Sequence, residues 1–598
     1  MIKHIVTSVA ISAAALAVST GEGRAVTGSA GVSHVLLISI DGMHALDFIN
    51  CATASPVSCP NLASLKANGV NYLQASASKP SDSFPGLTAI VSGGSPRTEG
   101  AFYDVAYDRV LAPPQNTTGN GLAGGACRAG APNGTGTEYE EGIDLDQSKL
   151  NGGAPPPAGP YDGGIASIDP TRLVRDPFNQ CQPVWPWNFV RTNTIFSVIH
   201  QAGGYVAWSD KHPSYSSVAG PSTIPGPAGS ILDDYYSPEI NSVPINLPVT
   251  LPIPVTTANG AGVAGPTTTN CTPLPDASAL TSDYTNSFTN IQCYDQLKAN
   301  AIINQINGLK HNGLAPAPVP NLFGMNFQSV SVNQKLIEKT LHPVVKGGYL
   351  DNVGTPSTSL AKAIKFVDAS IGQMITALKT QGLYNSTLIV ITAKHGQSPV
   401  DSSRYLGINI AANGNTSPIT TSPATILANC LTPSQSSSQI GPTEDDVSLL
   451  WLTQAPGCTT TAAVSNLEAQ SPATSNIAGI GQIFSGNGIA QMFNPPGLPS
   501  QGGDPRTPDI IVTPDVGVTY SGSSKKQAEH SGFSHDDTNV ILLLSNPRLN
   551  PVTVITQVET AQIAPTILQT LGLNPSSLQA VQIEGTQVLP SVNFNSAN

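Results

Sequence analysis

The sequence lacks three features that would point to particular classes of protein. Beyond its start it has no apolar run of the roughly 18 residues that a membrane-spanning helix needs. It has no C-x-x-C pair, which weakens the case for a cysteine metal cluster. Its 26 Lys and Arg residues are outnumbered by 38 Asp and Glu, giving a net charge of −12. We therefore expect no nucleic-acid-binding surface, and any bound phosphate must be held by a local group of side chains.

The first 25 residues are typical of a secretory signal peptide. Lys3 precedes an apolar run over residues 5–19, and small residues follow around Ala25. The run includes several hydroxyl side chains and is too short to anchor the chain in a membrane. We therefore expect a secreted or periplasmic protein that has no membrane span.

The chain contains eight cysteines, an even number. In a protein with a signal peptide, an even number favours disulfide bonds. The sequence does not fix their pairing. The simplest interpretation joins neighbours along the chain: Cys51 with Cys59, Cys271 with Cys293, and Cys430 with Cys458.

Short apolar runs rich in leucine and β-branched residues predict strands that are buried on both faces. They occur at residues 34–40, 205–208, 388–392, 509–512 and 540–544. The clearest helix precedes one of them. Apolar residues recur at helical spacing over 360–378, with Ser357 or Ser359 as N-cap and Gly382 after the end. A helix followed by a buried strand predicts an α/β fold, with a mostly parallel central sheet and helices on both faces.

With 598 residues the chain is longer than one compact core usually is, yet no linker divides it. We expect a single domain over residues 30–598 with three loop-rich insertions. They cover about 111–180, 212–290 and 411–505, where Pro, Gly, Asn and Thr are dense. Such insertions either form lids that select substrates or are surface segments held by disulfides, and the sequence leaves both interpretations open.

Polar residues directly follow three of the predicted strands. Asp41 follows the first, Lys211 and His212 follow the second, and Lys394 and His395 follow the third. One aspartate after a strand is more often a cap or turn residue. In an open parallel sheet, however, ligands bind beyond the carboxyl ends of the strands, so these side chains are expected to lie together. Carboxylate, imidazole and ammonium groups in one place predict a metal or phosphate site.

Two further segments supply a candidate nucleophile and a candidate metal ligand. Pro85 favours a helix start, which places Ser83 where free N–H groups and the helix dipole favour an oxyanion or a bound phosphate. Taken alone, Ser83 is better explained as a helix N-cap. His530 stands in a glycine-containing loop. It is a candidate for a neutral metal ligand, although a solvent-exposed loop histidine is the simpler interpretation.

Together these segments resemble the type I phosphodiesterase/nucleotide pyrophosphatase family of the alkaline phosphatase superfamily. The matches are Asp41-Gly42 with its first metal aspartate, Ser83-Phe84-Pro85 with its Thr-Phe-Pro-Asn nucleophile segment, His395-Gly396 with its Asp-His-Gly, and His530 to Phe533 with its late His-Gly-Tyr/Phe. They follow the family's order and extend over about 34–110 and 295–575. The resemblance implies an alkaline-phosphatase-like fold and a metal-dependent hydrolase with a phosphate-ester substrate.

The sequence departs from the family pattern at the metal ligands. Lys394 stands where the family has an aspartate. The family's Asp-x-x-Gly-His motif has two candidate counterparts. One begins at Asp351 and has Thr355 in place of the histidine, and the other, further upstream, replaces both ligands by Ser331 and Lys335. We prefer Asp351, because the glycine is retained and the long helix follows directly.

The resemblance implies Zn²⁺, as one or two ions, or another divalent metal. The implied ligands are Asp41, Ser83, Asp351, His395 and His530. Each catalytic zinc usually has about three protein ligands, so this set is too small for a full pair. A single ion, with Lys394 replacing the charge of the other, is the alternative, and sulfatases resemble that arrangement.

The implied reaction is attack of the metal-held Ser83 oxygen on phosphorus, followed by hydrolysis of the phosphoseryl intermediate by water. Lys394 is the second candidate catalytic residue. Lys211 and His212 are candidates for binding the phosphoryl oxygens of the substrate.

Two other functions remain open. A sulfatase or phosphonatase of the same superfamily is the first, but a sulfatase requires an arginine where this chain has Leu87. A secreted binding protein on a degenerate enzyme scaffold is the second, and the replaced ligands favour it. Metal content discriminates the binding protein from the hydrolase, because a binding protein can be metal-free, whereas the hydrolase cannot. The substrate's identity, the preference for monoesters or diesters, and the oligomeric state are not determined by the sequence.

Overall fold

The computed structural model describes residues 28, 31–116, 125–139, 164–241, 248–252, 267–270, 284–339, 341, 343–411, 416–432, 443–470 and 477–595. The expected signal peptide and Cys271 lie outside these residues. In this part of the chain, no helix is both long and apolar enough to cross a membrane.

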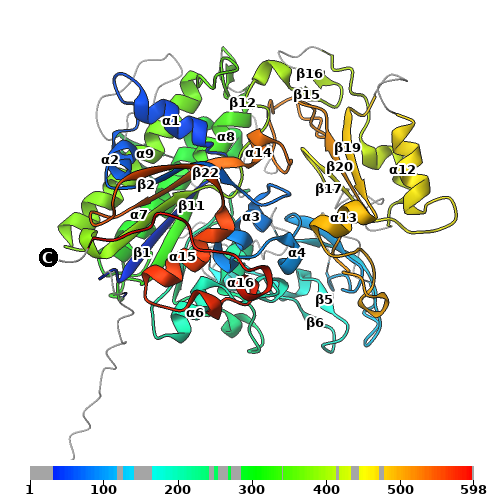
Figure 1. The fold of residues 1–598 in the computed structure, drawn as a ribbon, viewed down its shortest axis with the longest axis horizontal. Coiled ribbons are helices and arrows are strands. Elements are labelled where there is room, and N and C mark those ends of the chain that lie inside the picture. Colours follow the sequence, from blue (N-terminus) through cyan, green and yellow to red (C-terminus); the bar gives the residue numbers. More distant parts are fainter. Residues whose placement is uncertain are drawn as a thin grey trace, which may run out of the picture.

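A six-stranded sheet forms the centre of the molecule (Figure 1). Its strand order is β11 (Leu322–Phe327), β1 (His34–Ile40), β14 (Thr387–Thr392), β21 (Asn539–Ser545), β2 (Gly69–Ser76) and β22 (Val552–Glu559). β1 pairs in parallel with β11 and β14, and β2 with β22, while β21 is antiparallel to both of its neighbours. All residues of β11 and β14 are buried, as expected for strands covered on both faces.

Two groups of helices cover the faces of this sheet, which confirms the predicted α/β architecture. The first comprises α1 (Ala45–Thr53), α2 (Pro60–Lys66), α7 (Phe288–Ile306), α8 (Ser329–Lys335) and α9 (Thr358–Thr380). The second comprises α3 (Ser83–Ser92), α6 (Ile195–Gln201), α15 (Ile563–Thr570) and α16 (Gln579–Glu584). Figure 1 shows α1, α2, α8 and α9 above the strands and α6, α15 and α16 below them.

The long helix α9 matches its prediction from the sequence. Its N-cap is Ser357, whose side chain accepts a hydrogen bond from the backbone N–H of Leu360. Gly382 follows the helix with a φ of 71°, a left-handed conformation that favours glycine. The apolar face of α9 packs on α7, α8 and α2.

Two of the five predicted strands are arranged differently from expectation. The run at 540–544 forms β21, which is antiparallel to its neighbours. The run at 509–512 forms β20 (Ile510–Pro514), which lies outside the central sheet. An apolar run indicates that a strand is buried on both faces. It does not determine the direction of that strand or the sheet to which the strand belongs. The run at 205–208 includes β7 (Ala207–Trp208). The residues that flank β7, Val206 and Ser209, each form a parallel β-bridge to β11.

β20 belongs to a second, antiparallel sheet that appears at the right of Figure 1. Its order is β17 (Thr443–Glu444), β18 (Ser448–Leu450), β20 and β19 (Ile480–Ser485), and α12 (Thr460–Glu468) and α13 (Asn487–Met492) accompany it. Leu450 and Val512 belong to one hydrophobic cluster, whereas Leu449 and Ile511 belong to another. Because side chains alternate along a strand, each cluster covers one face of this sheet. Burial on both faces explains why β20 has a continuous apolar run.

Three disulfides join the described cysteines. The bonds Cys51–Cys59 and Cys430–Cys458 confirm two of the predicted neighbour pairs. The third, Cys127–Cys181, joins residues 54 positions apart. Cys293 is buried in α7 and has no disulfide partner among the described residues.

Candidate active site

Ser83 is the first residue of α3, and the N-cap of this helix is Asp82. The Asp82 carboxylate accepts a hydrogen bond of 3.1 Å from the backbone N–H of Phe84. The interpretation of Ser83 as a simple N-cap is therefore wrong. Its hydroxyl is free to take part in another interaction.

The Ser83 hydroxyl lies between a lysine and a carboxylate. Lys211 Nζ donates to Ser83 Oγ over 2.9 Å, and Ser83 Oγ donates to Asp41 Oδ2 over 3.4 Å. Asp41 directly follows β1 and Lys211 follows β7, so the ends of parallel strands bring both side chains to the start of α3. Ser83 and Asp41 have no exposed surface, and Lys211 is 7% exposed.

Asp41 is surrounded by hydrogen-bond donors. Asn326 Nδ2 donates to its Oδ1 and Gln328 Nε2 to its Oδ2, each over 2.7 Å. Lys394 Nζ and His395 Nε2 lie 3.8 and 3.6 Å from Oδ2. Burial raises the pKa of Asp41, but Lys394, His395 and Lys211 together outweigh burial and hold this pKa well below its usual value. Asp41 is therefore an ionised carboxylate at neutral pH.

A second buried carboxylate, Asp210, completes a balanced set of charges. Lys394 Nζ donates to Asp210 Oδ1 over 2.7 Å, and the indole N–H of Trp208 donates to Asp210 Oδ2 over 3.1 Å. Lys394 Nζ also lies 4.1 Å from the centre of the Tyr215 ring, a favourable cation–π position. Asp41 and Asp210 thus face the ammonium groups of Lys211 and Lys394, two negative charges against two positive ones.

Close backbone packing holds α3 against the residue that follows β14. A Cβ atom at Gly86 would collide with the backbone carbonyl of Lys394. A larger residue at position 86 would therefore require the backbone to shift. Gly86 therefore allows Lys394 and Ser83 to lie in the same site.

His395 and His530 extend the site away from Ser83. Their ring centres are 4.1 Å apart. Burial lowers the pKa of His530, and the neighbouring His395 and Lys335 lower it further, well below the usual value. His530 is therefore neutral at physiological pH, the state in which an imidazole binds a metal or accepts a proton. Ser531 has a φ of 89°, a strained backbone conformation for a residue other than glycine.

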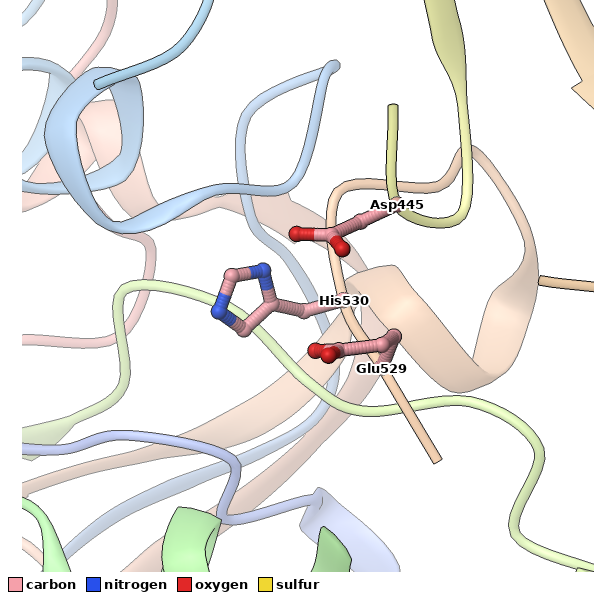
Figure 2. Close-up of side chains that lie close together, drawn as sticks. All are labelled: Asp445, Glu529 and His530. Carbon is pink, nitrogen blue, oxygen red and sulfur yellow. The ribbon is translucent and has the colours of Figure 1, made fainter. Parts of the chain in front are cut away.

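Beside His530 lies a group of side chains that could hold a metal ion (Figure 2). Asp445, Glu529 and His530 each offer one ligand atom, and these atoms all lie within 4.8 Å of one another. The hydroxyl of Tyr103 donates to Asp445 Oδ2. Lys526 binds Glu529 Oε1, which leaves Glu529 Oε2 and His530 Nδ1 buried without a hydrogen bond in the described structure. Burial and the charge of Glu529 raise the pKa of Asp445 to about 7, so a cation here would relieve crowded negative charge.

The two halves of the site differ in how well they suit a metal. At Asp41, Ser83 and His395 the atoms are of ligand type, but ammonium groups lie next to the same oxygens and already balance the charge. A divalent cation does not fit there. Asp445, Glu529 and His530 offer two carboxylates and a neutral imidazole. Lys526 and Lys335 lie beside Glu529, but among the described residues no ammonium group forms an ion pair with Asp445 or His530, so the donor types fit a single divalent ion.

The structure does not bring Asp351 to the site. Its carboxylate accepts hydrogen bonds from the backbone N–H groups of Val353 and Thr355, over 3.1 and 2.9 Å, in a surface loop. Its Asp-x-x-Gly pattern is therefore that of a local turn. The other candidate counterpart of the Asp-x-x-Gly-His motif does reach the site. Lys335, at the end of α8, has its Nζ 3.7 Å from Glu529 Oε2. Lys335 thus lies beside the candidate metal group.

Ser331, the other residue of that alternative, donates from its hydroxyl to Gln397 Oε1 over 3.1 Å. His212 lies in a buried pair with a glutamate. Its Nδ1 lies 2.8 Å from Glu239 Oε1. The predicted residues that lie together are therefore Asp41, Ser83, Lys211, Lys394, His395 and His530.

Sequence reasoning missed several residues of the site. Asp82 and Glu529 stand next to predicted residues, so proximity to those motifs was an available signal. Gln328 lies just beyond β11, where the rule for strand ends could have found it. Asp445 lies in the third insertion and carries no local signal.

Comparisons with known proteins identify the family of this chain. The family model "Type I phosphodiesterase / nucleotide pyrophosphatase" matches residues 35–217 and 348–537, more than half of the chain. No curated protein matches by sequence. Among solved structures, murine ectonucleotide pyrophosphatase/phosphodiesterase 5 is 13% identical, with a TM-score of 0.48 and coverage of 91% of this chain and 96% of its own. The human protein is 12% identical, with a TM-score of 0.47 and coverage of 90% and 95%.

Proposed function

Because this chain belongs to the type I phosphodiesterase/nucleotide pyrophosphatase family, we propose that it hydrolyses phosphate esters outside the cytoplasm through a phosphoseryl intermediate on Ser83. The observation that carries this proposal is the environment of the Ser83 hydroxyl. It is not used as a helix cap, and it lies between Lys211 Nζ and Asp41 Oδ2. A hydroxyl so placed can lose its proton toward the carboxylate while the ammonium group stabilises the oxygen.

Each neighbouring charge has a role in the proposed reaction. Lys211 and Lys394 would stabilise the negative charge of the phosphoryl oxygens during in-line attack. Asp210 positions Lys394 through the 2.7 Å hydrogen bond. Lys211 and His530 keep 7% of their surface exposed, whereas Ser83 keeps none.

We further propose that one divalent metal ion, Zn²⁺ or an ion with a similar preference for ligands, binds at Asp445, Glu529 and His530. A bound metal supplies Lewis-acid stabilisation of oxygen charge and lowers the pKa of a bound water. Neutral His530, and a Glu529 Oε2 that accepts no hydrogen bond in the described structure, support the assignment. The three disulfides support an oxidising, extracytoplasmic location.

The reaction is tested with a panel of p-nitrophenyl phosphate monoesters, diesters, phosphonates and sulfates, combined with acid quenching and peptide mass spectrometry. We expect turnover of a phosphate ester and a phosphate group on Ser83 in the quenched enzyme. A panel without any turnover, in the presence of added Zn²⁺, would contradict the proposal. Preferred turnover of the sulfate would instead favour a sulfatase.

The metal site is tested by metal analysis of purified variants. Asp445→Asn and His530→Ala should each lose most of the bound metal, because each removes one of three ligands. The matched control is Glu444→Gln, since Glu444 is half-buried next to Asp445 but accepts hydrogen bonds from Ser448 and from the backbone N–H of Ala424. If both ligand variants keep the metal content of the control, the ion binds elsewhere.

A further inference from the structure

Near Ser83 the protein supplies its own fixed positive charge. Lys211 Nζ is 2.9 Å from Ser83 Oγ, and Lys394 Nζ lies 3.8 Å from Asp41 Oδ2 and 2.7 Å from Asp210 Oδ1. We propose that Lys211 and Lys394 take the place of a metal ion at Ser83, so that phosphoryl transfer to this serine proceeds without a metal bound there. This inference rests on the proposed function, in which Ser83 is the nucleophile.

The hydrogen bonds of Asp41 leave no room for a metal ion. Its Oδ1 accepts from Asn326, and its Oδ2 accepts from Gln328 and from Ser83. A metal bound to Ser83 Oγ at the usual distance of about 2 Å would be next to the ammonium group of Lys211. Like charges so close together in a buried site repel strongly. The lysines therefore exclude the ion whose charge they replace.

Both lysines are held in place by the fold. Lys394 is completely buried, its ammonium group faces the Tyr215 ring, and its backbone carbonyl packs on Gly86 of α3. The Tyr215 ring also lies 6.1 Å from the ring of Phe84, the residue after Ser83. Rigid charges aimed at the reacting oxygen stabilise charge without a reorganisation step.

The chemical step balances without a metal. As the Oγ–P bond forms, the bond from phosphorus to the leaving oxygen breaks, and that oxygen keeps the electron pair. The Ser83 proton passes to Asp41 Oδ2, to which Oγ already donates a hydrogen bond. Lys211 keeps its protons and donates to Oγ throughout. Water then attacks phosphorus, so the Oγ–P bond breaks, Oγ takes a proton back from Asp41, and phosphate is released.

The test measures phosphorylation of Ser83 in a single turnover, using the mature chain and a p-nitrophenyl phosphate ester. The protein is stripped with a chelator, its metal content is measured, and the phosphoseryl species is quantified by intact mass after acid quench. We expect the stripped enzyme to form the intermediate at a rate within about threefold of the metal-loaded enzyme. Lys211→Met should slow its formation by about 100-fold or more, because a positive charge at the attacking oxygen is lost.

Lys211→Arg keeps the charge and should recover part of the lost rate, which a merely structural role of Lys211 would not predict. Lys310→Met is the matched control. Lys310 is another partly buried lysine that donates to Tyr205 and to the carbonyl of Asp233, away from Ser83. This control should form the intermediate at the wild-type rate.

Two results would overturn the inference, and they are distinguishable. If chelation abolishes phosphorylation of Ser83 and Zn²⁺ restores it, phosphoryl transfer to this serine needs a metal, and the proposed function survives without the inference. If Ser83 is not phosphorylated in any metal state although ester is turned over, the nucleophile assignment fails and the inference fails with it.

Discussion

Replacing Ser83 by alanine separates a catalytic role from a structural one, because the structure assigns the helix cap to Asp82. The substitution removes the Oγ atom and leaves the start of α3 and the neighbouring lysines in place. In proteins with a nucleophilic serine, such a change lowers kcat by about 10⁴- to 10⁶-fold. At about 1.4 kcal/mol for each tenfold change, this loss equals about 5–8 kcal/mol of transition-state stabilisation.

The expected effect on stability is much smaller. Ser83→Ala removes the 2.9 Å hydrogen bond from the Lys211 ammonium group and the weaker 3.4 Å bond to Asp41. A hydrogen bond to a charged group contributes about 1.5–3 kcal/mol. The free energy of unfolding should therefore fall by no more than about 3 kcal/mol, while activity falls far more than this loss can explain.

The assay compares kcat, using p-nitrophenyl esters, with the free energy of unfolding from urea titration. Thr88→Val is the matched control, because Thr88 is also buried in α3 and its hydroxyl donates to the carbonyl of Phe84 over 2.8 Å. This variant should lose about 1 kcal/mol of stability and keep its kcat. If Ser83→Ala also retains kcat within about tenfold, water attacks phosphorus directly and the nucleophile assignment is wrong.

Three further predictions concern stability and the disulfides. Burial raises the pKa of Asp504, but the hydrogen bonds and charge of Arg191 outweigh it and lower this pKa to about 2. Because the folded pKa lies below the unfolded value of 3.8, Asp504 should contribute about 2 kcal/mol above pH 4 and lose it as the pH falls to 2. Urea titration of Asp504→Asn should show this difference at pH 7 and none near pH 2, and an equal difference at both pH values would contradict it. Replacing Cys127 and Cys181 by serine opens a loop of 54 residues and should lower the unfolding free energy by about 4 kcal/mol in the chain-entropy model; an unchanged midpoint of unfolding would show that this bond does not form. Thiol titration in denaturant should find at most two reactive cysteines among the eight, since three disulfides use six of them, and a count near eight would refute the disulfide assignment.

Much of the Ser83 site was predictable because its residues stand next to local signals. Asp41 and Lys394 each follow a buried strand, and parallel strands in one sheet bring such residues to the same edge. Ser83 lies at a helix start that Pro85 made visible. In each case the position depends on a few neighbouring residues and on the strand direction.

The error at Asp351 has a physical reason. An aspartate followed by glycine forms a local turn as readily as it forms part of a metal site, and here it bonds to the N–H groups of its own loop. Asp445 could not be predicted, because no local sequence pattern marks it. It belongs to a sheet far from Glu529 in the sequence, and only the packing of that sheet places the two carboxylates near His530.

The sequence by itself determined the α/β class, the order of the motifs and the presence of Lys394 after the third predicted strand. Those features depend on local apolar runs and on residue identity, which short segments determine. The tertiary structure decided the antiparallel direction of β21 and the separate sheet of β20. It also decided that Lys211 faces Ser83 while Asp351 does not join the site. These outcomes depend on distances between segments remote in sequence, which are fixed only when the helices, the two sheets and the insertions pack together.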